Sequence, residues 1–249
     1  FQADARKVYA FGNIELVSEN HADYWMAGIT QLRKNWPDRF VMASIMADGS
    51  AQGDWVELAQ RSEQAGAVAV ELNFSCPHGG MPPHAVGAAI GQDPVIAARI
   101  VRWVREAVKI PVLVKLTAAV SDLRQLGRVL VDAGVDGFCT INSFPVLLGV
   151  DLKTHSPLPS VCGKGNLGGY TGRALKPIAL RATSEIAPLG KPVSGCGGLT
   201  TWEDAAEFVL LGATTLQVCS AVMLEGYGII TDLCEGLTGY LEEQGATTL

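Results

Sequence analysis

The stretch "KPVSGCGGLTTWEDAAEFVLLGATTLQVCSA" (residues 191–221) decides the expected fold. An apolar run ends in a glycine turn, a segment of helix formers follows it, and a second apolar run ends in small polar residues. Thr200 or Thr201 is suited to begin the helix, and Gly212 lies where the helix gives way to the second run. A strand, a helix and another strand in this order are typical of a parallel sheet built from βα units.

The same pattern recurs along the chain and predicts six strands, at residues 40–46, 67–76, 111–117, 134–142, 191–198 and 213–222. Polar residues and glycines follow most of these runs. In a (β/α)8 barrel the carboxyl ends of the strands form the active face, and the loops after strands 7 and 8 commonly hold phosphate. If the last two runs are those strands, residues 40–46 form the third strand of the barrel.

We therefore expect an α/β fold of the (β/α)8 TIM-barrel type, with the first two βα units missing from this chain. Residues 1–249 would form a single, N-terminally incomplete domain of a longer polypeptide, because six strands of a barrel would leave unpaired edges. The alternative is an open, doubly wound sheet of six strands, which is complete as it stands.

Composition excludes several classes of protein. A formal net charge of -6 provides no basic surface for nucleic acid or for an anionic membrane surface. No apolar run is long enough to cross a bilayer, and the N-terminal residues do not have the layout of a signal peptide, so we expect a cytoplasmic protein. The six cysteines lie singly and far apart, so we expect neither a metal site nor an iron-sulfur cluster.

Three polar residues near the ends of predicted strands are candidates for a binding site. Lys115 interrupts the apolar run "VLVKLT", where an unpaired ammonium would be costly to bury. It either points into the mouth of the barrel beside an anion or a polar ring of a ligand, or it extends outward to solvent or pairs with a neighbouring carboxylate. Asn73 and Asn142 end the runs "ELN" and "TIN", and they either cap the following turns or present amides to a flat ligand.

Cys76 follows Asn73 in "ELNFSCPHGG" (residues 71–80). A single cysteine at the end of a strand is either a small packed hydrophobe or a reactive group. The expected position of Cys76 on the active face favours a reactive thiol.

Several stretches together resemble one family. In order along the chain these are "FGNIELVSE", "ELNFSCPHG", "GQDP", "VKLT", "TIN", "GGYTGRALKPIALR", "SGCGG" and "LQVCSA". The combination resembles the FMN-binding barrel of the dihydropyrimidine dehydrogenases, within the dihydroorotate dehydrogenase superfamily. The chain departs from this family in "KLTAA", where relatives carry Pro and Asn, and at Ser143, where they carry Thr.

The resemblance implies roles for particular residues. Cys76 would be the catalytic proton donor or acceptor. The pyrimidine would be bound by Asn13, Glu15, Asn73, Asn142 and Ser143. FMN would be bound by Lys115, Thr171, Gly172, Gly197, Gly198, Cys219 and Ser220.

The implied activity is reduction or formation of the 5,6 double bond of uracil or thymine, with hydride passing through FMN. Electrons would come from an electron-donating subunit or domain that carries NAD(P)H, FAD or iron-sulfur sites, either in segments missing from this chain or on a partner, and we expect an oligomer. The alternatives are a dihydroorotate dehydrogenase-like enzyme or ene-reductase for another cyclic amide or enone, a flavin-free phosphate-binding lyase or isomerase, and a non-catalytic subunit.

Overall fold

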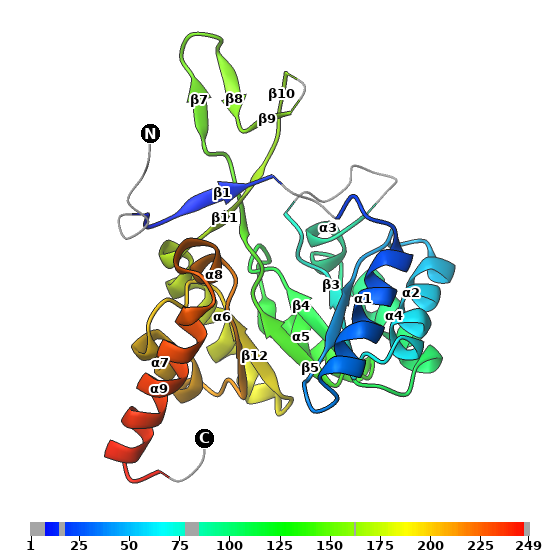
Figure 1. The fold of residues 1–249 in the computed structure, drawn as a ribbon. Coiled ribbons are helices and arrows are strands. Elements are labelled where there is room, and N and C mark those ends of the chain that lie inside the picture. The colour runs from blue at the N-terminus through cyan, green and yellow to red at the C-terminus, as the bar shows by residue number, and fades with distance from the viewer. Residues whose placement is uncertain (1–7, 15–17, 78–84, 162, 247–249) are drawn as a thin grey trace. The chain divides into compact units, whose positions relative to one another are not determined.

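The computed structural model describes residues 8–14, 18–77, 85–161 and 163–246 (Figure 1). The chain divides into two compact units, one made of residues 1–14 and 139–249 and the other of residues 15–138. Each unit is described by itself.

The unit of residues 15–138 alternates strands and helices. Its elements in chain order are α1 (Ala22–Asn35), β2 (Met42–Ile45), α2 (Gln52–Gln64), β3 (Ala69–Asn73), α3 (Ala88–Gly91), α4 (Pro94–Ala107), β4 (Val112–Leu116) and α5 (Leu123–Asp132). The last two residues of this unit, Gly137 and Phe138, are also the first two residues of strand β5 (Gly137–Thr140). Strand β3 pairs in parallel with β2 and with β4, as the βα pattern predicts.

The strands of this unit have two different faces because side chains alternate along a strand. On β4, Val112, Val114 and Leu116 are fully buried, and helix α4 packs against the strand. Lys115 points to the opposite face, where β3 contributes Glu71 and Asn73. One face of the strands therefore builds the core, and the other carries the polar residues.

Residue-level signals set the ends of helix α4. Asp93 is its N-cap and accepts hydrogen bonds from the amides of Val95 and Ile96 at 2.9 and 3.1 Å, and Pro94 is its first residue. This is the helix start that the sequence predicts. Five apolar residues of the helix are buried: Ala97, Ala98, Ile100, Val101 and Val104.

The other unit combines the last two parallel strands with a group of short antiparallel strands. Its parallel part holds the end of β5, α6 (Lys176–Ile186), η3 (Ala187–Leu189), β12 (Val193–Cys196), α7 (Trp202–Leu210), β13 (Thr215–Gln217), α8 (Ser220–Glu225) and α9 (Gly228–Glu243). Its antiparallel part holds β1 (Phe11–Asn13), β6 (Phe144–Val146), β7 (Gly149–Asp151), β8 (Ser156–Leu158), β9 (Ser160–Val161), β10 (Lys164–Gly165) and β11 (Gly168–Thr171), and η2 (Arg173–Leu175) leads back to α6.

Apart from β1, the antiparallel strands lie in the first part of the long stretch between residues 143 and 191, and η2, α6 and η3 follow them. Strand β11 lies between β1 and β6, whereas β7 with β8 and β9 with β10 form hairpins that extend away from this small sheet (Figure 1). These strands are two to four residues long and rich in Gly and Pro, so they show too little alternation to be recognised in the sequence.

All six predicted strands are present, and they have the order β13-β12-β5-β4-β3-β2. The predicted α/β fold is therefore confirmed, and it agrees with part of a (β/α)8 barrel. That two further βα units belong to the same domain stays a prediction.

Candidate functional site

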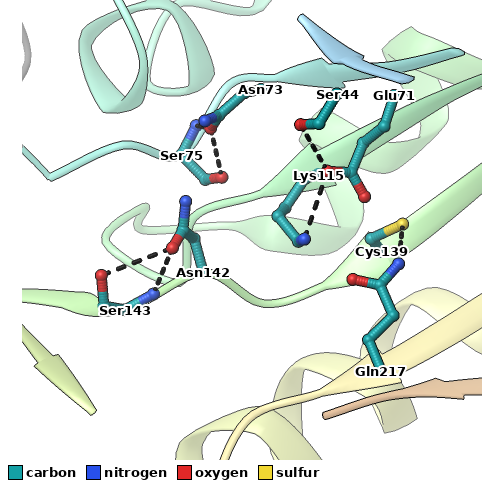
Figure 2. A network of polar contacts seen from close by, with 9 residues as sticks. All are labelled: Ser44, Glu71, Asn73, Ser75, Lys115, Cys139, Asn142, Ser143 and Gln217. Carbon is teal, nitrogen blue, oxygen red and sulfur yellow. Dashed lines mark hydrogen bonds and ion pairs between the residues drawn. The ribbon is translucent and has the colours of Figure 1, made fainter. Parts of the chain in front are cut away.

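A cluster of polar side chains is formed by residues of the neighbouring strands β2, β3 and β4 (Figure 2). The register places Ser44 beside Glu71 and Asn73 beside Lys115. Lys115 Nζ lies 3.2 Å from Glu71 Oε1, and Ser44 Oγ donates a 2.8 Å hydrogen bond to the same oxygen. The structure shows the pairing of Lys115 with a neighbouring carboxylate, and a ligand beside Lys115 stays a prediction.

Asn73 is oriented by the residues that follow it. Its Oδ1 accepts hydrogen bonds from the amide of Ser75 at 3.1 Å and from Ser75 Oγ at 2.9 Å, which is the geometry of an Asx turn. The capping interpretation thus describes what this oxygen does within the chain. The same bonds hold the side chain in one orientation beside Lys115, where a ligand would meet a fixed amide.

Cys76 lies three residues beyond the end of β3 and is 4% exposed. The amide of Ala88 donates a 2.9 Å hydrogen bond to the carbonyl oxygen of Cys76, so the start of α3 supports the backbone at this position. A side chain at Gly87 would overlap Cys76, with its Cβ 2.7 Å from that of Cys76. Cys76 therefore sits in a backbone segment that is held by two structural elements, β3 and α3.

In the other unit, Asn13 and Ser143 meet over a glycine. Strand pairing sets Asn13 of β1 opposite Gly169 of β11. A Cβ built at Gly169 would lie 2.8 Å from Asn13 Oδ1 and 3.0 Å from Ser143 Cβ. Two of the predicted substrate-binding residues are therefore brought side by side, although 130 positions separate them in the sequence.

Asn142, the third predicted substrate-binding residue of this unit, is held by its neighbour. Its Oδ1 accepts a 2.8 Å hydrogen bond from the amide of Ser143, and Ser143 Oγ lies 3.4 Å from the same atom (Figure 2). Here too the amide oxygen has the local role that the capping interpretation describes. Glu15, the remaining predicted substrate ligand, lies outside the described residues.

The loops after β12 and β13 present backbone amides at one edge of the sheet. Cys196 and Gln217 are opposite each other in the parallel register, so the two loops begin side by side. In the described part of the chain, the amides of Gly197, Gly198, Cys219 and Ser220 donate no hydrogen bond to another protein group. Unpartnered amides that share an edge are suited to bind an anion such as a phosphate.

The glycine turn after β12 is fixed by a network around Asp204. Its Oδ2 accepts hydrogen bonds from the amides of Thr200 and Thr201 at 2.9 and 3.0 Å, and its Oδ1 accepts one from Lys176 Nζ at 2.6 Å. Thr201 caps α7 in a capping box with Asp204, as the sequence predicts for one of the two threonines. Gly198 has φ of +77°, and a Cβ there would lie 2.7 Å from the backbone nitrogen of Lys176.

This network changes the acid-base properties of its members. Burial alone raises the pKa of Asp204, but the hydrogen bonds from Lys176, Thr200 and Thr201 outweigh it and leave that pKa below its ordinary value. The hydrogen bond to Asp204 raises the pKa of Lys176, against the smaller effect of burial. Both groups are therefore charged at neutral pH.

The other predicted cofactor residues lie at the end of β11. Thr171 pairs with Phe11 of β1, and Gly172 follows it with φ of +91°. A Cβ at Gly172 would lie 3.0 Å from the carbonyl oxygen of Tyr9, so this glycine allows the chain to pass close to the residues that precede β1.

Sequence reasoning missed three residues that shape these clusters. Glu71 and Gly169 belong to no polar pattern in the sequence, and Asp204 resembles any acidic residue in the first turn of a helix. One signal was present for Glu71, because it lies two positions before Asn73 in a strand and so must share its face.

The described residues contain neither a cluster of metal-binding side chains nor a membrane-spanning helix. No group of three or more His, Cys, Asp or Glu is placed to hold a metal ion in residues 8–14, 18–77, 85–161 and 163–246. In the same residues, every helix is too short or too polar to cross a membrane.

Comparison with known proteins identifies the family. A family model described as dihydroorotate dehydrogenase matches residues 17–241. The chain is 38% identical to the chloroplastic dihydropyrimidine dehydrogenase (NADP(+)) of Arabidopsis thaliana over 249 residues, and 39% identical to the NAD-dependent dihydropyrimidine dehydrogenase subunit PreA of Escherichia coli K12 over 243 residues. These alignments cover 97% and 96% of this chain but 58% of each relative.

A third relative is the catalytic subunit of dihydroorotate dehydrogenase B (NAD(+)) from Pyrococcus abyssi. It is 39% identical over 226 residues, which cover 90% of this chain and 72% of the relative. The resemblance read from the sequence is confirmed, and the chain belongs to the dihydroorotate dehydrogenase family.

Proposed function

We propose that this chain is the FMN-binding, substrate-converting part of an oxidoreductase that adds or removes hydrogen across the 5,6 double bond of uracil or thymine. The observation that carries the proposal is the position of Cys76, a buried thiol just beyond the end of β3. The same strand end carries Asn73, which lies beside Lys115 in the register. The names of the plant and Escherichia coli relatives support a pyrimidine substrate.

FMN fits the residues of the unit that contains β12 and β13. The amides of Gly197, Gly198, Cys219 and Ser220 would hold its phosphate, because they share an edge and have no partner among the described protein groups. Thr171 and Gly172 would contact the cofactor from the end of β11, and Lys115 would contribute a positive charge. When bound, FMN supplies or accepts the hydride at one carbon of the double bond.

Four polar residues would hold the pyrimidine ring. Asn73 and Asn142 are each fixed by the hydroxyl residue that follows, and Asn13 and Ser143 converge over Gly169. The oxygens of Asn73 and Asn142 accept hydrogen bonds within the chain, so these two amides would donate from Nδ2 to the carbonyl groups of a pyrimidine. Glu15 would be a further ligand.

Transfer of a hydride to one carbon of the double bond requires transfer of a proton to the neighbouring carbon, and Cys76 would donate that proton or, in the reverse direction, accept it. In the reducing direction, the carbon next to the one that receives hydride takes the proton of the Cys76 thiol, and the resulting thiolate regains a proton from solvent. Thiols have an ordinary pKa of about 8.5, so they are mostly protonated near neutral pH and still lose the proton readily. The two electrons come from the electron donor.

The test is turnover of Cys76→Ala with uracil and an artificial reductant, which removes the need for a partner subunit. We expect turnover to fall by about 10² to 10⁴, the usual contribution of one general acid, while absorbance near 450 nm shows that FMN stays bound. Cys234→Ala is the matched control, because Cys234 is exposed on α9. Full turnover of Cys76→Ala would refute the role of Cys76 as the proton donor, and colourless protein would refute the assignment of FMN as the cofactor.

Dihydroorotate is the second candidate substrate, because the Pyrococcus abyssi relative and the Escherichia coli relative are each 39% identical to this chain over the residues aligned. A panel of uracil, thymine, dihydrouracil and dihydroorotate separates the two. Oxidation of dihydroorotate without reaction of uracil or thymine would replace the first proposal by this one.

An electron-donating partner follows from the same relatives, two of which are named as subunits. Since the chain spans 58% of the length of the first two relatives, the donor would be another subunit or a further segment that carries NAD(P)H, FAD or iron-sulfur sites.

A further inference from the structure

The short helix α3 packs against the backbone of Cys76 and of the residues just before it. A Cβ added at Gly87 would lie 2.6 Å from the carbonyl oxygen of Cys76, and one added at Gly91 would overlap the carbonyl oxygen of Phe74. The amide of Ala88 also donates a 2.9 Å hydrogen bond to the carbonyl oxygen of Cys76. The position of the Cys76 backbone therefore depends on the position of α3.

The residues that lead into α3 are held in turn by the loop after β2. The amide of Gly49 donates a 2.7 Å hydrogen bond to the carbonyl oxygen of Ala85. The carbonyl oxygen of Gly49 accepts a 3.1 Å hydrogen bond from Arg99 Nη2 on α4. Both backbone groups of Gly49 are thus bound by residues 85–99, the stretch of chain that contains α3.

The loop after β2 and its arginine partner have further fixed contacts. The guanidinium carbon of Arg99 lies 5.1 Å from the ring centroid of Trp103, one turn further along α4, and a cation is attracted to the face of such a ring. On the other side of the loop, the fully buried Trp55 donates a 2.9 Å hydrogen bond from Nε1 to the carbonyl oxygen of Asp48. The same indole packs edge to face against Phe74, with ring centroids 5.8 Å apart.

We propose that Gly49 and Arg99 are positioning residues for Cys76. They hold Ala85, the chain from Ala85 leads into α3, and α3 fixes the backbone of Cys76. The inference deepens the proposed function and rests on it, because a thiol that exchanges a proton with the substrate must lie within hydrogen-bond reach of the reacting group. A displacement of about 1 Å at such a group can lower a rate by about 10². Gly49 and Arg99 need no contact with a ligand for this role.

The experiment measures how readily Cys76 becomes accessible to a small reagent. The full chain is treated with iodoacetamide under native conditions, and alkylation of Cys76 is followed by peptide mass spectrometry. A thiol that is 4% exposed reacts when its surroundings open. In Arg99→Ala we expect a rate about two- to tenfold higher, which is the usual effect of one hydrogen bond on an equilibrium.

Gly49→Ala tests the same contact from the other partner. Gly49 is buried, and its added Cβ would lie 3.0 Å from Ile96 Cγ2 and 3.3 Å from the carbonyl oxygen of Ala85. This side chain would push Ala85 away from the loop, so we expect faster alkylation of Cys76 in this variant as well.

Arg102→Ala is the matched control, because Arg102 is an exposed arginine on the same helix. It should leave the alkylation rate of Cys76 unchanged. The exposed thiols of Cys219 and Cys234 calibrate the reagent in every sample. Hydrogen exchange of the β4 amides reports opening of the whole unit of residues 15–138, and it should be the same in all variants.

An unmoved alkylation rate of Cys76 in Arg99→Ala or in Gly49→Ala overturns the role of that residue. Equal acceleration of β4 exchange also overturns it, because a general loss of stability would then explain the result. If Gly49→Ala does not fold, Arg99→Ala decides, since Arg99 is exposed. In enzyme that carries FMN, kcat with uracil should fall about two- to tenfold in Arg99→Ala while KM stays nearly constant.

The alkylation experiment needs neither cofactor nor substrate, so it separates this inference from the proposed function. Faster alkylation in Arg99→Ala together with full turnover of Cys76→Ala contradicts only the role of Cys76 as the proton donor. Loss of turnover in Cys76→Ala together with an unmoved alkylation rate in Arg99→Ala contradicts only the positioning role.

Discussion

Asp204→Asn should destabilise the unit that contains β12 and should weaken binding of the cofactor phosphate. The carboxylate accepts from Lys176 on one oxygen and from Thr200 and Thr201 on the other. An Asn has one acceptor oxygen, so its NH₂ group must face either the ammonium or the two amides. Charged hydrogen bonds contribute about 1.5–3 kcal/mol each, and we expect a loss of about 2–4 kcal/mol of unfolding free energy. For a chain of this size that lowers Tm by about 4–16 °C.

The pH dependence of this loss has a definite sign. The pKa of Asp204 lies below its ordinary value in the folded state, so its contribution is present above the unfolded pKa of about 4 and is lost as the pH falls further. The pKa of Lys176 is raised, so its contribution is present below the unfolded pKa of about 10.4 and is lost as the pH rises through the folded value. Between these two pH limits the difference in unfolding free energy between the wild type and Asp204→Asn should be constant.

Urea unfolding at several pH values, together with fluorescence titration of FMN, measures both effects. Glu207→Gln is the matched control, because Glu207 contacts the same Lys176 Nζ at 2.9 Å from an exposed position. Glu207→Gln should lower the unfolding free energy by less than about 1 kcal/mol. The reasoning fails if the two variants are equally stable at pH 7, or if the deficit of Asp204→Asn is undiminished at pH 3.

Two glycine substitutions extend these tests. Gly169→Ala should raise the dissociation constant of the pyrimidine while FMN stays bound. The added Cβ would displace Asn13 and Ser143 at a cost of about 1–3 kcal/mol. Gly149→Ala is the control, because no atom lies near its added Cβ, and it should bind the pyrimidine as the wild type does. Gly198→Ala should lose FMN, as judged by absorbance near 450 nm, because its Cβ would overlap the backbone of Lys176. Gly190→Ala is the control, because Gly190 has nearly the same φ but no atom near the added Cβ. It should lose only about 1–2 kcal/mol of unfolding free energy and keep FMN.

The parallel strands were predictable because each is a run of apolar, often β-branched residues between polar ends. The run at residues 111–117 contains β4 at Val112–Leu116, and the run at 191–198 contains β12 at Val193–Cys196. The antiparallel strands were not predictable, because strands of two to four residues carry too little periodicity and their pairing depends on segments far apart. Strand β1, for example, pairs with β11 about 160 positions later.

Site residues that interrupt an apolar pattern could be predicted from the sequence. Residues that support them through contacts with distant parts of the chain could not. Lys115 is conspicuous because it interrupts "VLVKLT", and Asn73 because it ends a strand. Gly169 could not be identified, because its importance lies in the side chains of Asn13 and Ser143 that meet over it. A sequence pattern shows which face a residue shares with its neighbours in the chain, but it does not show which other strand will lie beside it.

The alternation along β3 and β4 ties folding to the proposed chemistry. Val114 and Leu116 are fully buried in the core, and Lys115 between them must therefore point to the other face. A shift of one residue in register would bury the ammonium among the helices and expose two core residues, so the packing of the core enforces the orientation of Lys115. The same holds for Glu71 between Val70 and Leu72, both fully buried. The hydrophobic effect that forms this core thus also places both charged side chains on one face, where they pair at 3.2 Å.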